Sequence, residues 1–90
     1  MDFEYVKLLD AEADGGIVFL SVLHKKTGIV AYTYLSNEIL SSPNFLNWGE
    51  MEKKLNSYIE KANKDGVKIL KETILLEIHR DLIKIYKDFV

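Results

Sequence analysis

Histidine is the side chain whose charge changes nearest to neutral pH, and this chain has two, His24 and His79. Neither has a second histidine at metal-ligand spacing, and a general base needs neighbouring partners that the sequence does not specify. His24 precedes Lys25 at the end of an expected strand, so we expect a half-exposed hairpin residue there. The chain has no cysteine, which excludes disulfides, thiolate zinc sites and cysteine nucleophiles.

Three carboxylates at alternate positions, Asp10, Glu12 and Asp14, resemble the start of a calcium-binding loop. Gly15 stands at the sixth position of such a loop, as the pattern requires. The twelfth position is Ser21, where the loop needs a bidentate glutamate, and the flanking segments have strand composition. The pattern therefore favours a solvated hairpin tip over a cation site. We predict no metal ion and no cofactor.

The segment His79-Arg80-Asp81-Leu82 matches the start of the catalytic loop of protein kinases, and Asp88-Phe89 resembles their metal-binding motif. That family requires asparagine where Tyr86 stands and glycine where Val90 stands, together with a glycine-rich nucleotide loop that is missing here. We interpret the match as a coincidence. The sequence also lacks a Ser-His-Asp arrangement, a phosphate loop and a paired-carboxylate motif, so we expect a protein that is not an enzyme.

Lys25, Lys26, Tyr32 and Tyr34 form a weak version of a nucleic-acid-binding surface, in which cations contact phosphates and aromatic rings stack on bases. Elsewhere, helical lysines alternate with carboxylates, which is typical of a solvated helix face. Nucleic-acid binding by the hairpin 24–34 is therefore the alternative function and not the preferred one.

The composition limits what these residues can build. The chain has 90 residues, of which 48% are hydrophobic and 29% charged, and its net charge is −2. A chain of this size has room for one compact domain, so we expect a single domain over residues 1–90. The acidic start and the short apolar runs predict neither a signal peptide nor a membrane segment. We therefore expect a cytoplasmic protein without a membrane partner.

Segments rich in β-branched and aromatic residues predict three strands, at 3–9, 17–23 and 29–35. Gly28 lies where a hairpin loop needs a residue with positive φ, and it predicts that the second and third strands form a hairpin. The connection 10–16 ends in two glycines and favours a turn as well. The three strands are thus expected to form an antiparallel meander.

Helical spacing replaces strand spacing in the second half of the chain. Apolar residues recur every three or four positions from Trp48 to Ala62, which predicts an amphipathic helix with Asn47 as its cap and Gly66 at its end. The same spacing over 67–90 predicts one long helix. Its solvent side is expected to carry Thr73, Glu77, Arg80, Lys84 and Lys87. Many β-branched residues in 67–78 keep a fourth strand before a shorter helix as an alternative.

The order of hairpin, loop and amphipathic helix between Ile17 and Ala62 is similar to the opening of longin and roadblock-type domains. Those domains scaffold small GTPases and trafficking complexes and often dimerise. They continue with further strands, where this chain is expected to form a long helix. The resemblance covers about half of the chain and is one of fold, which does not carry function.

Apolar residues occupy both faces of the expected strand 17–23, whereas an antiparallel sheet with one wet face should alternate apolar and polar residues. A second apolar ridge repeats every seven residues along the last helix. Helices that wrap both faces of the sheet would bury this surface within one chain. We prefer a second copy as the cover, in a two-fold dimer. The predicted interface comprises Ile69, Leu76, His79, Ile83, Tyr86 and Val90.

The sequence therefore predicts an α+β fold, a three-stranded antiparallel meander followed by two helices of which the C-terminal one is long. The predicted function is that of a non-catalytic protein-interaction module, a small homodimeric regulator or inhibitor that occupies the surface of a partner protein.

Overall fold

The computed structural model of the chain describes residues 3–36 and 49–89. It confirms the predicted α+β order of three antiparallel strands followed by two helices. The elements are β1 (Val6–Asp14), β2 (Ile17–His24), β3 (Val30–Leu35), α1 (Gly49–Lys64) and α2 (Lys71–Phe89). The predicted helix cap at Asn47 and the interface residue Val90 lie outside the described residues. None of the helices described is long and apolar enough to span a bilayer.

The first strand differs from its prediction at both ends. It begins at Val6 instead of residue 3, and it continues through residues 10–14, which we expected to form a connecting tip. The turn needs only Gly15 and Gly16, whose φ angles of 56° and 83° are those of a two-residue hairpin loop. Because the turn is this short, the preceding residues are free to pair with β2, apart from a register shift between Leu8 and Asp10.

The second hairpin, between β2 and β3, follows the prediction. Gly28 has a φ of 72°, which an L side chain rarely adopts. Its N–H donates to the carbonyl of His24, and the N–H of His24 donates to the carbonyl of Ile29, both at 2.8 Å. These bonds fix the register in which Ser21 faces Tyr32 and Phe19 faces Tyr34.

A glycine cap ends α1, and α2 starts later than predicted. Gly66, with a φ of 80°, donates to the carbonyl of Asn63, and Val67 donates to that of Ala62, which is the Schellman arrangement. The chain then runs without regular structure to Lys71. The long helix is thus confirmed with a start at Lys71 instead of 67, and the alternative of a strand over 67–78 is wrong.

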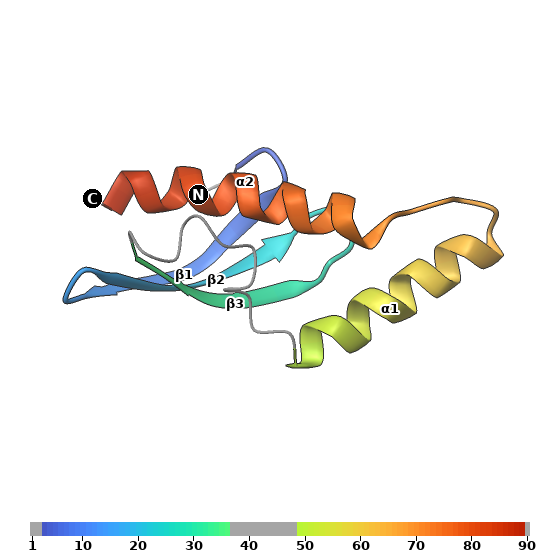
Figure 1. Cartoon of the computed structure of the whole chain (residues 1–90), viewed down its shortest axis with the longest axis horizontal. Helices are drawn as coiled ribbons and strands as arrows, with labels where there is room; N and C mark the ends of the chain where they lie inside the picture. The colour runs from blue at the N-terminus through green and yellow to red at the C-terminus, as the bar shows by residue number, and fades with distance from the viewer. Residues whose placement is uncertain (1–2, 37–48, 90) are drawn as a thin grey trace.

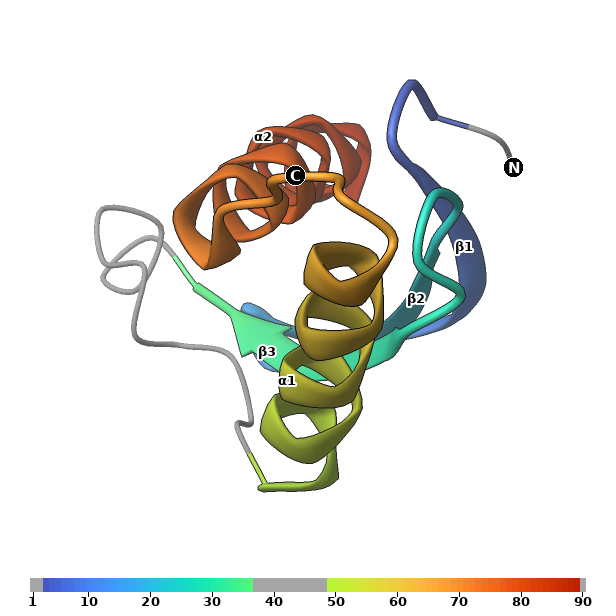
Figure 2. The same cartoon turned by 90° about the vertical axis from the view of Figure 1, so that its right-hand side faces the viewer.

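Helix α2 lies across one face of the sheet, and α1 lies beside the end of the sheet that carries the β2–β3 hairpin (Figures 1 and 2). The core fills the space between α2 and the sheet, and α1 closes it with Met51 and Leu55. The inward side chains of β2 and β3 alternate with outward ones, as strand geometry requires. The buried apolar residues are Val6, Val18, Leu20, Val22, Ile29, Ala31, Leu35, Met51, Leu55, Ile74, Ile78, Leu82, Ile85 and Tyr86.

One buried carboxylate joins the C-terminal helix to the N-terminal strand. Asp81 of α2 is 0% exposed, and its Oδ2 accepts hydrogen bonds from the backbone N–H groups of Tyr5, at 2.6 Å, and Val6, at 3.0 Å. Lys84 lies one turn further along, with its Nζ 3.9 Å from Oδ1. Hydrogen bonds to a charged acceptor are stronger than those between neutral groups. Asp81, which in the sequence resembled the catalytic aspartate of a kinase, therefore has a structural role, because it connects α2 to the start of β1.

We predict that Asp81→Ala lowers the free energy of unfolding by about 3 kcal/mol, because a buried N–H group, that of Val6, and a partly buried one, that of Tyr5, lose a charged acceptor. Urea unfolding measures this change. Asp88→Ala is the matched control, since Asp88 is exposed on the same helix, and it should change the stability by less than about 0.5 kcal/mol. Equal effects of the two substitutions would contradict the role assigned to Asp81.

Candidate interaction surface

The one histidine predicted at a hairpin is buried, not half-exposed. His24 is 1% exposed, and its Nδ1 lies 2.8 Å from the Thr27 hydroxyl. That hydroxyl also accepts a hydrogen bond from the N–H of Ile29 at 3.3 Å. The other ring nitrogen, Nε2, faces Oε1 of Glu77 at 3.4 Å. Glu77, predicted on the solvent side of the helix, is only 17% exposed because it turns toward His24.

Burial lowers the pKa of His24 below 6.5, because the surrounding protein replaces the water that would solvate the imidazolium. The negative charge of Glu77 opposes this shift, Lys26 reinforces it, and Asp81 opposes it more weakly. The imidazole ring of His24 lies on the core side of the sheet and has almost no contact with solvent. We interpret this cluster as a structural tie between the hairpin and α2. Within residues 3–36 and 49–89, no group of three or more His, Asp or Glu side chains is arranged to hold a metal ion.

The opposite face of the sheet, which we call the open face, points away from α2. The strand register arranges its side chains in rows that run across the sheet from β1 to β3. Two rows occupy its centre, and each begins with a carboxylate on β1. The rows are Lys7, Leu23 and Val30; Asp10, Ser21 and Tyr32; Glu12, Phe19 and Tyr34; and Asp14 with Ile17.

Aromatic rings are the most exposed apolar groups of this face. Tyr32 is 60% exposed, and Phe19 and Tyr34 each expose about half of their surface. The rings of Phe19 and Tyr34 contact each other at a tilt, with their centroids 6.2 Å apart. Ile17, Leu23 and Val30 add partly exposed aliphatic surface. A surface with contiguous apolar side chains of this kind is typical of a binding site.

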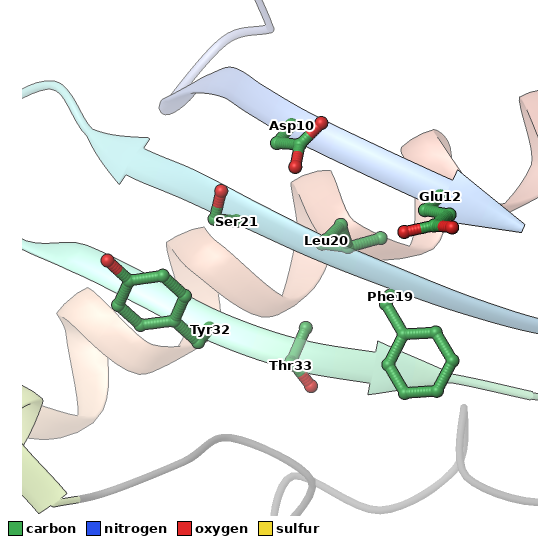
Figure 3. A pocket seen from close by; sticks show the side chains of 7 residues that line it. All are labelled: Asp10, Glu12, Phe19, Leu20, Ser21, Tyr32 and Thr33. Atoms are coloured by element: carbon green, nitrogen blue, oxygen red, sulfur yellow. The ribbon is translucent and has the colours of Figure 1, made fainter.

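A shallow hollow of about 270 Å³ lies at the centre of the open face (Figure 3). Asp10 and Glu12 border it on β1, Phe19 lies on β2, and Tyr32 lies on β3. The hollow exists because Ser21, on the central strand β2, has a smaller side chain than Asp10 and Tyr32, its neighbours in the same row. We call this feature the Ser21 hollow.

The residues of the predicted homodimer interface do not form one exposed ridge. Leu76 is 58% exposed, and His79 and Ile83 are half-buried. Ile69 precedes α2 and packs partly against the core, so the ridge does not extend to it. Tyr86 is 2% exposed and belongs to the core. Val90 lies outside the described residues, so whether a second copy binds here stays a prediction.

The four residues of the alternative nucleic-acid surface are all exposed, but they divide into two places. Tyr32 and Tyr34 lie on the open face, in the two rows that begin with Asp10 and Glu12. Lys25 and Lys26 lie at the β2–β3 turn, and the Lys25 ammonium donates to the carbonyl of Phe3. The tyrosines therefore have carboxylates, and not lysines, in their own rows.

Sequence reasoning missed Asp10, Glu12 and Phe19 as members of one surface. The signal was present, since acidic residues at every second position are typical of one face of a strand. Because two glycines follow these residues, the segment was interpreted as a loop, and the alternation typical of a strand was not recognised.

Comparison of the chain with protein-family models, with curated proteins and with solved structures finds no match. Function therefore has to be inferred from the geometry of the described residues.

The lowered pKa of His24 predicts how stability depends on pH. The unfolded chain binds the proton more readily than the native state, so protonation favours unfolding. The contribution of His24 to stability should be complete above pH 6.5 and should decrease as the pH falls from 6.5 toward the folded pKa. Urea unfolding of the native chain and of His24→Gln at several pH values measures this contribution as a difference. A stability advantage of the native chain that grows on acidification would contradict the account.

Proposed function

We propose that this protein is a non-catalytic protein-interaction module that binds a partner protein through its open face. The observation that carries the proposal is the exposure of Phe19, Tyr32 and Tyr34 on a sheet face that α2 does not cover. Aromatic side chains are enriched at the centres of protein interfaces, because they remove much apolar area from water at a low cost in entropy. A regulator or inhibitor that acts by occupying a partner's surface needs only such a face.

Two observations support a non-catalytic role over catalysis. The cluster of His24 and Glu77 lies on the core side of the sheet, where a substrate would have to open the fold to reach it. Asp81 is committed to the backbone of Tyr5 and Val6. The polar groups best suited to proton transfer are therefore occupied in holding α2 against the sheet.

The charges of the open face favour a protein partner over a nucleic acid. The exposed rings of Tyr32 and Tyr34 support base stacking, which is the alternative function. However, Asp10 and Glu12 lie in the same rows and would repel phosphates. A protein surface has no such requirement for positive charge.

Self-association is the second part of the proposal, and Leu76 supports it. This side chain exposes apolar surface on α2, with the half-buried His79 and Ile83 nearby on the same helix. Because Tyr86 is buried, such a contact would be centred on Leu76 and would leave the open face of each copy available to a different protein.

We predict that peptides selected from a random display library on the immobilised protein bind the open face. Phe19→Thr together with Tyr34→Thr should lower the affinity of the protein for these peptides by about tenfold or more, because two aromatic contacts are lost. Threonine keeps the preference for a strand, so the fold should persist. Isothermal titration calorimetry measures the affinity. Unchanged affinity in the double variant would show that the peptides bind elsewhere and would reject the open face as the binding surface.

Leu76→Asp is the matched control, since Leu76 is as exposed as these rings but lies on α2. It should leave the peptide affinity unchanged. In sedimentation equilibrium it should convert a dimer to a monomer, because a charge in an apolar contact is costly. Self-association is rejected if the native chain is already monomeric.

A further inference from the structure

The Ser21 hollow has acidic and aromatic walls that face each other across β2. Asp10 and Tyr32 lie on opposite sides of Ser21, as the register of the three strands requires. Glu12 and Phe19 form the next row and border the same space. Figure 3 shows these side chains on the side of the sheet away from α2. A group that enters the hollow therefore meets carboxylates on one side and ring surface on the other.

The negative charge of this site is not compensated by its surroundings. Among the described residues, no lysine, arginine or histidine forms an ion pair with Asp10 or Glu12. The basic side chain of the open face, Lys7, belongs to the neighbouring row, with Leu23. The lysines at the β2–β3 turn lie beyond the end of the strand. The hollow is thus complementary to a positive charge.

Aromatic rings beside carboxylates are suited to one kind of side chain in particular. A guanidinium group stacks on the face of a tyrosine or phenylalanine ring and also donates paired hydrogen bonds to a carboxylate. The aliphatic stem of arginine can cover apolar surface such as that of Phe19 while its charge stays near water. A simple metal cation would use the carboxylates but gain little from the rings.

From this geometry we infer that the Ser21 hollow binds an arginine side chain of the partner protein. The inference rests on the proposed function, because it names the partner's chemistry at the open face. The guanidinium lies between the carboxylates of Asp10 and Glu12 and the ring of Tyr32. Apolar residues on either side of the arginine contact Phe19, Tyr34 and Leu23. The partner is therefore a basic and apolar segment.

Two synthetic peptides test this inference on the full chain. The first is acetyl-Gly-Leu-Arg-Leu-Gly-amide, and the second carries citrulline, which has the shape of arginine without its charge. Backbone amide shifts in NMR titrations locate the binding site and give both dissociation constants. The arginine peptide should bind about tenfold more tightly, since one ion pair and one cation–π contact are added. Its advantage should decrease with added salt.

The double variant Asp10→Asn with Glu12→Gln should bring the arginine peptide to the affinity of the citrulline peptide. The control is Glu60→Gln with Asp65→Asn, which removes the same charge from exposed positions at the end of α1 and should keep the preference. The inference is overturned if both peptides bind the open face equally well, although the proposed function then stands. If neither peptide shifts the amides of the open face, the arginine site is rejected, and the display experiment decides separately about the face itself.

Discussion

A single layer of helix covers a sheet that has apolar side chains on both faces, and this mismatch determines the rest of the structure. Residues of β2 alternate between the two faces, yet both sets contain large apolar side chains. Helix α2 buries the set with Val18, Leu20 and Val22. The other set includes Phe19, which stays half exposed. The removal of such apolar surface from water is favourable, so the open face provides a driving force for association.

The position of α2 is fixed by polar contacts as well as by packing. Asp81 binds the backbone at the start of β1, and Glu77 faces the buried His24 at the end of β2. Apolar contacts alone would tolerate sliding of the helix along the sheet, since they have little directional preference. Hydrogen bonds to particular backbone groups do not tolerate such sliding, because they require specific distances and angles. These contacts therefore fix the position of α2 along the face of the sheet that it covers.

Local signals predicted the architecture well, and contacts between distant residues account for what was missed. The positive φ of Gly28 and the spacing of apolar residues in both helices depend on neighbours in sequence, so the hairpin and the two helices were predicted, although α2 starts at Lys71 instead of 67. The burial of His24 and the role of Asp81 depend on residues more than fifty positions away. To place Asp10 and Glu12 on one surface, the register of β1 against β2 has to be known. That register depends on the two-residue turn at Gly15 and Gly16, which was expected to be longer.

Hydroxyl-radical footprinting of the dilute, unbound protein tests the exposure of this face most directly. Side chains react according to their contact with water, so Tyr32, 60% exposed, should be oxidised rapidly, and Tyr86, 2% exposed, should be protected. Phe19 should react nearly as fast as Tyr32. Protection of Tyr32 and Phe19 to the level of Tyr86 would contradict the account, because the open face would then be covered without a partner.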